Sequence, residues 1–173
     1  MNQIFLGLGT NLGDKMANLQ LAIKLLEQQV GPILQLSSVY QTEPWGLENQ
    51  AIFLNQVIEV QSQQTAFEIL DKILGIEKEM GRKRIQKWGT RLIDIDLLFY
   101  GNSQVLEPQL IIPHPFLQDR NFVLVPMAEI AADFPHPVLK KTMQQLLDNS
   151  TDTLKVVPFL GEPSAFDDFA DQN

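Results

Sequence analysis

Two aspartates, Asp94 and Asp96, carry the clearest chemical signal in this sequence. They lie within the apolar run Leu-Ile-Asp-Ile-Asp-Leu-Leu-Phe at 92–99, which predicts a β-strand. Alternate residues of a strand point to one face, so the two carboxylates lie side by side, about 6–7 Å apart. Two negative charges this close repel each other, and a cation between them removes the repulsion. Magnesium is the ion to expect, because it binds one or two carboxylates and fills its other positions with water and phosphate oxygens.

A positive segment comes directly before this strand. Residues 82–91 contain five Lys and Arg residues and no acidic residue, whereas the rest of the chain holds 8 basic and 21 acidic residues. Arginine binds phosphate oxygens in pairs, and lysine adds a point charge. An aspartate pair alone is more often a solvated strand face, and a charge run alone is more often a solvated loop. Side by side, they indicate a metal–nucleotide site, and hence an enzyme that transfers phosphate groups from ATP.

Composition and charge exclude several other classes of protein. The 173 residues suit one domain, which we place at 1–160, followed by an acidic tail at 161–173 that we expect to be flexible. The net charge of −8 argues against a general binder of nucleic acid or membrane surfaces. No apolar run approaches the ~18 residues of a membrane span, and the N-terminus lacks the basic start of a signal peptide. The absence of cysteine excludes disulfides and thiolate metal sites, so we expect a cytoplasmic enzyme.

The hydrophobic pattern predicts strands and helices in the order β-α-β-β-α-β. The strands are expected at 3–9, 32–40, 53–60 and 92–100. The first helix runs from Asp14 as N-cap to Gln29 and stops at Gly31, and the second begins at Thr65, which forms a capping box with Glu68. This order predicts an α+β fold with a ferredoxin-like sheet and both helices packed on one face of it.

A C-terminal extension is expected after the sheet. The tight turn Gly101-Asn102 predicts a hairpin that pairs the strand 92–100 with residues 104–106. A helix should start at about Val125, with Pro126 in its first turn, and a short helix should follow at 142–149.

The turn between the first strand and the first helix carries no nucleotide fingerprint. Gly7, Gly9 and Gly13 follow the spacing G-x-G-x-x-x-G, which is one residue longer than the dinucleotide fingerprint. The acidic residue expected about 20 positions later is missing, and no Gly-Lys-Ser/Thr of a P-loop is present. A nucleotide must therefore be held by another device.

These features together resemble the hydroxymethyl-dihydropterin pyrophosphokinases of folate synthesis. The most specific stretch runs from Gly81-Arg82-x-Arg84 through Lys87-Trp88-Gly89-x-Arg91 to Asp94-x-Asp96. The turn 7–13 and four shorter motifs match in the same order: Tyr40-x-Thr42-x-Pro44, Phe53-Leu54-Asn55, Pro113-His114-Pro115 and Arg120-x-Phe122. The resemblance extends to about residue 150 and implies a ferredoxin-like fold. It also implies transfer of a pyrophosphoryl group from ATP to the hydroxymethyl oxygen of the pterin, with release of AMP.

The resemblance also assigns roles to individual residues. It implies two magnesium ions on Asp94 and Asp96, with ATP as the co-substrate and with Arg82 and Arg91 offsetting charge during transfer. The ATP side comprises Glu77, Arg82, Arg84, Lys87, Trp88, Arg91, His114 and Arg120. The pterin side comprises Thr42, Trp45, Phe53, Asn55, Trp88 and Phe122, where two aromatic rings enclose the heterocycle and the amide of Asn55 reads its edge. The chain is also a candidate to associate with the next folate-pathway enzyme.

Four positions depart from the pattern of the family. Lys87 stands where the family often has an arginine, so it keeps the charge but lacks the two-pronged guanidinium. Phe53 stands where a tyrosine can occur, so it keeps the ring but lacks the hydroxyl. Leu74 and Gln109 stand where some members place polar and basic nucleotide contacts. These departures concern individual ATP and pterin contacts rather than the metal site.

The histidines and two loops complete the expectations. His114 is interpreted as a hydrogen-bond donor to a phosphate rather than as a base, although a purely structural role is about equally common for a single histidine. His136 is interpreted as structural. The segments 41–50 and 82–91 carry glycine and proline hinges and are expected to close over the ligands.

Three alternatives remain open from the residues alone. The first is a ferredoxin-like RNA-binding module that uses the cations of 82–91, although no aromatic pair is visible on adjacent central strands. The second is another metal-dependent nucleotide enzyme, such as a nuclease or a nucleotidyl transferase. The third is a non-catalytic interaction domain, which would leave Asp94 and Asp96 without a purpose.

Overall fold

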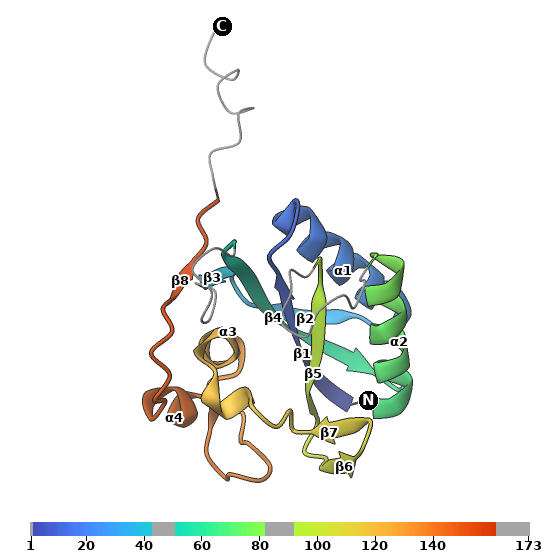
Figure 1. The fold of residues 1–173 in the computed structure, drawn as a ribbon. Helices are drawn as coiled ribbons and strands as arrows, with labels where there is room; N and C mark the ends of the chain where they lie inside the picture. The colour runs from blue at the N-terminus through green and yellow to red at the C-terminus, as the bar shows by residue number, and fades with distance from the viewer. Residues whose placement is uncertain (1, 43–50, 82–91, 162–173) are drawn as a thin grey trace, which may run out of the picture.

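The computed structural model describes residues 2–42, 51–81 and 92–161 of the chain. Within these ranges the elements follow in this order: β1 (Asn2–Thr10), α1 (Lys15–Gln29), β2 (Ile33–Leu36), β3 (Tyr40–Thr42), β4 (Phe53–Ser62), α2 (Ala66–Glu79), β5 (Asp94–Tyr100), β6 (Val105–Glu107), β7 (Leu110–Ile112), the short 3-10 helix η1 (Leu117–Asp119), α3 (Asn121–Ala131), α4 (Met143–Asp148) and β8 (Val156–Pro158). Figure 1 shows these elements around one central sheet.

The strands of the central sheet are antiparallel to their neighbours. Their order is β5-β1-β4-β3-β8, and β2 pairs with β4 next to β3. The predicted strand 32–40 is therefore two short strands on the same edge of β4. It is interrupted at Ser37, whose hydroxyl accepts the N–H of Val57 at 3.0 Å in place of a backbone carbonyl. With β2 and β3 counted together, the predicted ferredoxin-like sheet is confirmed.

The first two helices begin where the local sequence signals place them. Asp14 caps α1 by accepting the N–H of Ala17 at 3.0 Å. Thr65 and Glu68 form the predicted capping box at the start of α2. Gly31 follows the end of α1, as predicted, and no side chain fits there because a Cβ would lie 2.2 Å from the carbonyl oxygen of Gln61.

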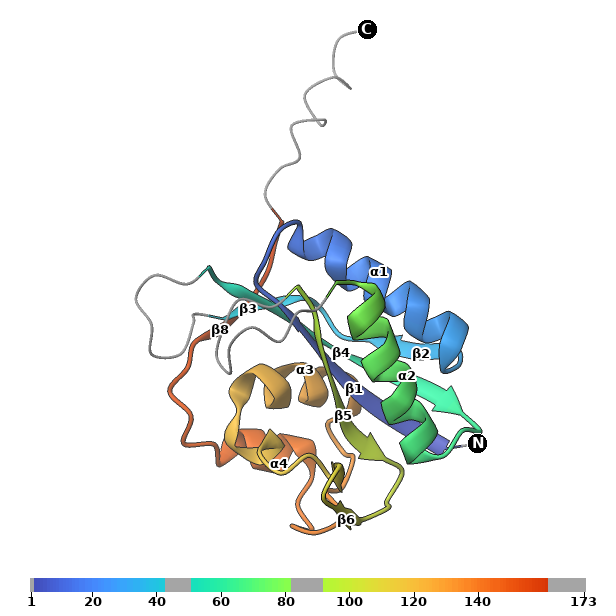
Figure 2. The same ribbon diagram turned by 45° about the vertical axis from the view of Figure 1, so that its right-hand side comes forward.

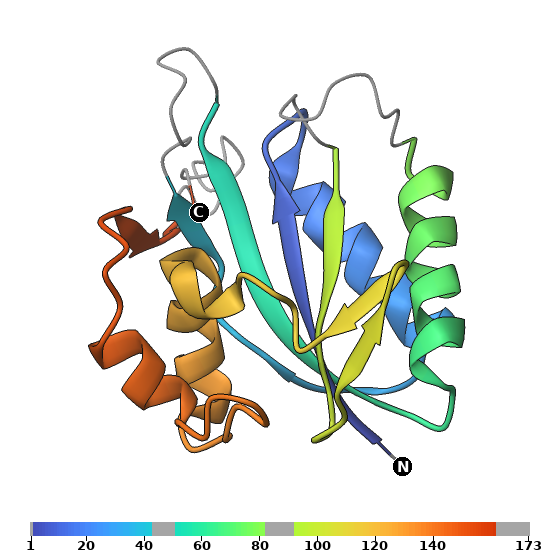
Figure 3. The ribbon, with the colours of Figure 1, turned by 60° about the horizontal axis from the view of Figure 1, so that its bottom comes forward.

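Two hydrophobic layers cover the two faces of the sheet. One buried cluster joins β1, β4 and β5 to α1 and α2, through residues such as Leu6, Ile58 and Ile73. The other joins the opposite face to α3 and α4, with Phe5 and Phe99 in its centre. Each fully buried side chain of this size stabilises the fold by roughly 1.5–3 kcal/mol. Figures 2 and 3 show the sheet between these two pairs of helices.

The predicted hairpin after β5 is wrong in its partner. Val105 to Glu107 pair with Leu110 to Ile112, so β6 and β7 form a separate two-stranded sheet. The N–H of Gly101 donates to the carbonyl of Gln3 at 2.6 Å, which extends the pairing with β1 instead of turning back along β5. Among the described residues no strand pairs with the outer edge of β5, which borders α2.

The predicted start of the third helix is also wrong. α3 begins at Asn121, so Pro126 lies inside the helix rather than in its first turn. No side chain of the preceding residue caps this helix. The N–H of Asn121 is bound instead by the carboxylate of Asp152 at 2.8 Å, a partner that local sequence patterns do not identify. The predicted short helix at 142–149 is confirmed as α4, with a capping box on Thr142.

The last strand and the C-terminal tail complete the description of the fold. β8 was not predicted and adds a strand beside β3, on the edge of the sheet opposite β5. No helix in the described ranges is both long and apolar enough to cross a membrane. Residues 162–173 lie outside those ranges, so the division into a domain at 1–160 and a flexible tail stays a prediction.

Candidate active site

The residues of β5 alternate between the two faces of the sheet, as the sequence predicts. Ile95 and Leu97 are buried in the cluster beneath α1 and α2, and Ile93 just before the strand joins them. Asp94 and Asp96 are half-buried and point to the opposite face. The prediction that both carboxylates share one face of one strand is confirmed.

A bulge in β5 sets the position of these carboxylates relative to β1. Phe5 pairs with Phe99 and Leu6 pairs with Leu97, so Leu98 is an extra residue on β5. The bulge lets Leu98 and Phe99 both enter the cluster under α3 and α4. It also shifts the register of everything before it on β5 by one residue.

This shifted register places glycines of β1 next to the aspartates. Asp94 pairs with Gly9 and Asp96 with Gly7, and Gly9 pairs on its other side with Asn55 of β4. Asp94, Gly9 and Asn55 thus form a row across three strands, with Asp94 and Asn55 roughly 10 Å apart because strands are about 4.8 Å apart. A Cβ on Gly9 would lie 3.1 Å from the amide oxygen of Asn55. Apart from its chain neighbours, no other atom of the described residues lies within 4 Å of that Cβ position.

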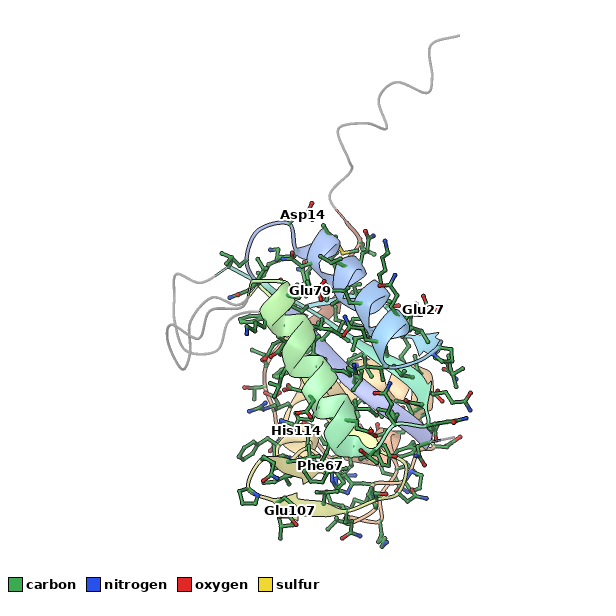
Figure 4. The ribbon with its side chains drawn as sticks, turned by 90° about the vertical axis from the view of Figure 1, so that its right-hand side faces the viewer. Asp14, Glu27, Phe67, Glu79, Glu107 and His114 are labelled. Atoms are coloured by element: carbon green, nitrogen blue, oxygen red, sulfur yellow. The ribbon has the colours of Figure 1, made fainter. Side chains whose placement is uncertain are left out.

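A pocket of about 340 Å³ lies along the outer edge of β5. α2, β5, the β6–β7 hairpin and the segment before η1 form its walls, and Figure 4 shows His114 beside α2 and above the hairpin that carries Glu107. Its polar lining consists of Glu77, Asp94, Asp96, Gln109 and His114, and its apolar lining consists of Leu70, Ile73, Leu74, Ile95, Leu97, Pro108, Leu110, Ile111 and Pro115. A pocket in which several polar side chains converge beside apolar ones is a candidate small-molecule site.

Glu77 ties α2 to the edge strand. It is only 3% exposed, and its Oε1 accepts the backbone N–H of Ile95 at 2.8 Å. Since β5 is the edge strand, this N–H points away from β1, and the carboxylate satisfies it. Glu77 thereby fixes β5 between Asp94 and Asp96. Its predicted contact with ATP stays a prediction.

His114 lines the pocket as a neutral ring. Its Nδ1 accepts the N–H of Phe116 at 3.4 Å, which leaves the proton of the neutral ring on Nε2. Burial, with the positive charge of Arg120 in addition, lowers the pKa of His114 to about 4, although the charge of Asp94 opposes this shift. A neutral N–H donor suits a phosphate oxygen, and a ring of such low pKa is a poor base at neutral pH.

Two of the side chains predicted to bind the pterin, Asn55 and Thr42, lie together on the other side of Gly9. The amide nitrogen of Asn55 donates to the hydroxyl of Thr42 at 2.9 Å, and both side chains are buried. Phe53 precedes Asn55 by two residues on the same face of β4. Phe122 opens α3, the helix that packs on this face, and the guanidinium of Arg120 lies 5.7 Å from its ring centre.

Other predicted site residues lie outside the described ranges: Trp45, Arg82, Arg84, Lys87, Trp88 and Arg91. The same holds for most of the two segments, 43–50 and 82–91, that are expected to close over the ligands. Their roles stay predictions.

Sequence reasoning missed part of the pocket. Leu70 and Ile73 line it from α2 beside Glu77 and Leu74, which the resemblance had already named, and the apolar stripe on this helix was the available signal. Pro108 and Ile111 line it from the hairpin, and no local signal indicates that this hairpin folds toward α2. Gly9 was placed at the end of the first predicted strand and in the turn that follows, but not in the row, because the row depends on strand register.

The donor set on β5 fits magnesium. Within the described ranges no three His, Asp or Glu side chains gather as a site that would hold a metal through protein groups alone. Two carboxylates beside an open pocket leave coordination positions for water and for phosphate oxygens, which is the arrangement that magnesium favours.

Residues 5–132 match the family described as 7,8-dihydro-6-hydroxymethylpterin-pyrophosphokinase (HPPK). This chain belongs to the HPPK family. A 2-amino-4-hydroxy-6-hydroxymethyldihydropteridine pyrophosphokinase of Aquifex aeolicus is 40% identical over 151 residues, which cover 87% of this chain and 94% of that protein. The protein of the same name from Bacillus subtilis is 42% identical over 132 residues, covering 75% of this chain and 79% of its own length.

Longer proteins contain an HPPK part as well. The folic acid synthesis protein fol1 of Pneumocystis carinii is 33% identical over 95% of this chain, which spans 22% of that protein. The crystal structure of Plasmodium falciparum HPPK-DHPS with SDX-DHP superposes with a TM-score of 0.71 at 19% identity. It covers 86% of this chain and 43% of that one, and at this identity it supports the fold alone.

We predict that Gly9→Ala lowers turnover of this HPPK about tenfold or more while changing the free energy of unfolding by less than about 1 kcal/mol. The new methyl group would stand in the row between Asp94 and Asn55, close to the amide oxygen of Asn55. Steady-state kinetics and denaturant unfolding measure the two effects. Gly75→Ala on the exposed side of α2 is the matched control, because its Cβ would meet no atom within 4 Å and should leave turnover unchanged. Full activity of Gly9→Ala would show that the substrates do not occupy the space above Gly9.

A second prediction concerns the protonation of His114. The chain has two histidines, so both ring signals can be followed by NMR, and the variant His114→Gln assigns them. Because the folded pKa of His114 is about 4, its ring should not titrate between pH 8 and pH 5.5. The unfolded chain binds this proton near its usual pKa of about 6.5, so the stability from neutral His114 is complete above that pH and is lost as pH falls toward 4. His114→Gln should flatten this part of the stability–pH curve, and a folded midpoint at or above 6.5 would show the assignment to be wrong.

Proposed function

We propose that this HPPK transfers a pyrophosphoryl group from ATP to the hydroxymethyl oxygen of 6-hydroxymethyl-7,8-dihydropterin, giving the pterin diphosphate and AMP. The observation that carries the proposal is the row Asp94, Gly9 and Asn55. It aligns a carboxylate suited to a cation with an amide suited to read a heterocycle, on either side of a residue without a side chain. The family match provides the reaction that such a juxtaposition serves.

The pocket beside β5 is proposed to take ATP. Its apolar walls, from α2 and the hairpin, suit the base and the ribose, including Leu74 and Ile111. Its polar side directs the triphosphate toward Asp94 and Asp96. His114 donates its Nε2–H to a phosphate oxygen, and Arg120 adds a positive charge nearby. Arg82, Arg84, Lys87 and Arg91 are assigned to the same triphosphate on the strength of the resemblance.

Asp94 and Asp96 are proposed to hold two magnesium ions together with the triphosphate. Bound magnesium supplies neutralisation of charge on the phosphate oxygens and on the departing AMP. The protein itself positions the two carboxylates. Glu77 fixes the edge strand, and the bulge at Leu98 sets Asp94 opposite Gly9 and Asp96 opposite Gly7.

The pterin is proposed to lie above Gly9, at the Asn55 end of the row. Asn55 presents its amide oxygen there, held in orientation by the hydroxyl of Thr42. Phe53 of β4 and Phe122 in the first turn of α3 are proposed to supply flat apolar surfaces for the ring, and Trp45 and Trp88 join them by resemblance. Phosphoryl-type transfer depends mainly on alignment and charge, so no strong general base is required.

The products test the reaction class directly. We expect incubation with magnesium, 6-hydroxymethyl-7,8-dihydropterin and ATP labelled on the β-phosphate to give AMP and a pterin that carries the label. Release of ADP would indicate transfer of a single phosphate, and release of unlabelled pterin with pyrophosphate would indicate hydrolysis. RNA binding that falls steeply with salt, without AMP formation, would favour the RNA-binding alternative.

The association with the next folate-pathway enzyme is part of the same proposal. It is supported by relatives in which HPPK and DHPS occur in one chain. A cytoplasmic location also belongs to it, since ATP and magnesium are both abundant there. Co-elution of the two purified enzymes at micromolar concentration tests the association, and separate elution would count against it.

A further inference from the structure

The chain after α4 forms an extended segment, residues 149–161, which we call the C-terminal strap. In Figures 1 and 3 it runs from α4 past α3 to the edge of the sheet, where it becomes β8. It lies beyond residues 5–132, which match the HPPK family. Two of its attachments lie at the start of α3 and along the outer side of β3.

Asp152 is the attachment at the start of α3. Its Oδ2 accepts the backbone N–H of Asn121 at 2.8 Å, and its carbonyl accepts the side-chain amide of Asn121 at 3.0 Å. Its Oδ1 accepts the N–H of Leu154 at 2.9 Å, and its own N–H donates to the hydroxyl of Ser150 at 3.2 Å. The carboxylate is thus held by both the strap and the helix. Since Arg120 gives α3 no side-chain cap, Asp152 caps this helix from 31 positions away.

The capped residue stands between two residues assigned to the substrates. Arg120 precedes Asn121 and Phe122 follows it. The guanidinium of Arg120 lies 5.3 Å from the ring centre of Phe116 and 5.7 Å from that of Phe122. The carboxylate that fixes the first N–H of α3 therefore fixes the backbone on which both side chains are mounted.

The other end of the strap holds the opposite wall of the pterin site. Val156 of β8 pairs with Thr42 of β3, and Thr42 accepts the amide of Asn55. The strap thus spans from the helix that carries Phe122 to the strand that carries Thr42. A second tie runs parallel to it, because Glu129 of α3 accepts the hydroxyl of Tyr40 on β3 at 2.8 Å.

We propose that Asp152 is a positioning residue for the pterin site, acting through Asn121 on Phe122 and Arg120. The proposal rests on the proposed function for the identity of the substrate. Asp152 touches neither substrate. It fixes the first turn of α3 relative to the strap, and the strap fixes that turn relative to Thr42 and Asn55.

Asp152→Ala and Asp152→Asn test the proposal, with Asp133→Ala as the matched control. Asp133 is exposed just beyond the other end of α3, and its replacement removes the same charge without altering the cap. We expect Asp152→Ala to raise the KM for the pterin about fivefold, the change that corresponds to loss of a typical helix cap. Asp152→Asn keeps one acceptor oxygen and should recover at least half of this change, whereas Asp133→Ala should stay within twofold of the parent, a margin of about 0.4 kcal/mol.

Hydrogen exchange of the amides of Asn121 and Phe122 provides a readout that does not need turnover. Exchange at these amides should rise about fivefold or more in Asp152→Ala and stay unchanged in Asp133→Ala. A lowered unfolding midpoint with unchanged KM and unchanged local exchange would show that Asp152 serves stability alone and would overturn the proposal. Failure of the parent protein to form AMP would instead overturn the proposed function, and the exchange result would still decide whether Asp152 positions α3. If Asp152→Ala does not fold, the comparison of Asp152→Asn with the parent carries the same two outcomes.

Discussion

Replacing Asp94 or Asp96 by asparagine is expected to reduce turnover by about 10³-fold or more, because each change removes a negative ligand from the proposed cation site. Asparagine has nearly the same shape as aspartate, so the change tests charge rather than packing. Both side chains are half-buried and lie outside the two hydrophobic clusters. The unfolding midpoint should therefore move by only a few degrees, roughly the effect of 1 kcal/mol or less.

Binding measurements separate this effect from a general loss of charge. In the parent protein, magnesium should tighten ATP binding, and in Asp94→Asn or Asp96→Asn that gain should disappear. Glu107→Gln is the matched control, because Glu107 is an exposed carboxylate of the neighbouring hairpin that does not line the pocket. It should retain the magnesium dependence. Magnesium-dependent turnover that survives in either aspartate variant would move the metal site away from β5.

The sequence was most informative where structure is decided by near neighbours. Asp14 and the pair Thr65 and Glu68 start helices through hydrogen bonds that span three residues, so the chain itself displays them. The same holds for the alternation of β5, which follows from the two-residue period of any strand. The aspartate pair could therefore be assigned to one face of a strand before any tertiary contact was known.

The features that escaped prediction depend on distant partners. The start of α3 is set by Asp152, and the break in the second predicted strand is set by the pairing of Ser37 with Val57. The bulge at Leu98 follows from how Phe99 packs with Phe5. No local pattern contains these contacts, because each joins residues that are 20 or more positions apart. The row Asp94, Gly9 and Asn55 could not be predicted for the same reason, since the register of three strands decides which residues lie side by side.

Substitution of Asn55 should act on the pterin and spare ATP. We expect Asn55→Ala and Asn55→Asp to raise the KM for the pterin about 100-fold or more, while the KM for ATP changes less than about threefold. Alanine removes the amide oxygen proposed to face the heterocycle, and aspartate places a negative charge there and replaces the nitrogen that donates to Thr42 by an acceptor. A buried polar edge of the ligand then lacks its partner, which is more costly than the loss of apolar contact. Steady-state kinetics in which each substrate is varied at a saturating concentration of the other gives both constants.

Two further variants show whether position or mere burial is responsible. Thr42→Val removes the acceptor that orients the amide of Asn55 but keeps the shape of the side chain, so the KM for the pterin should rise about tenfold. Gln56→Leu removes the next buried amide of β4, which points to the other face and donates to the carbonyl of Ser37. It should lower stability and leave the KM for the pterin within twofold, a margin of about 0.4 kcal/mol. If the KM for ATP rises in place of that for the pterin, Asn55 contacts the nucleotide. The proposal that the pterin lies at the Asn55 end of the row would then be wrong.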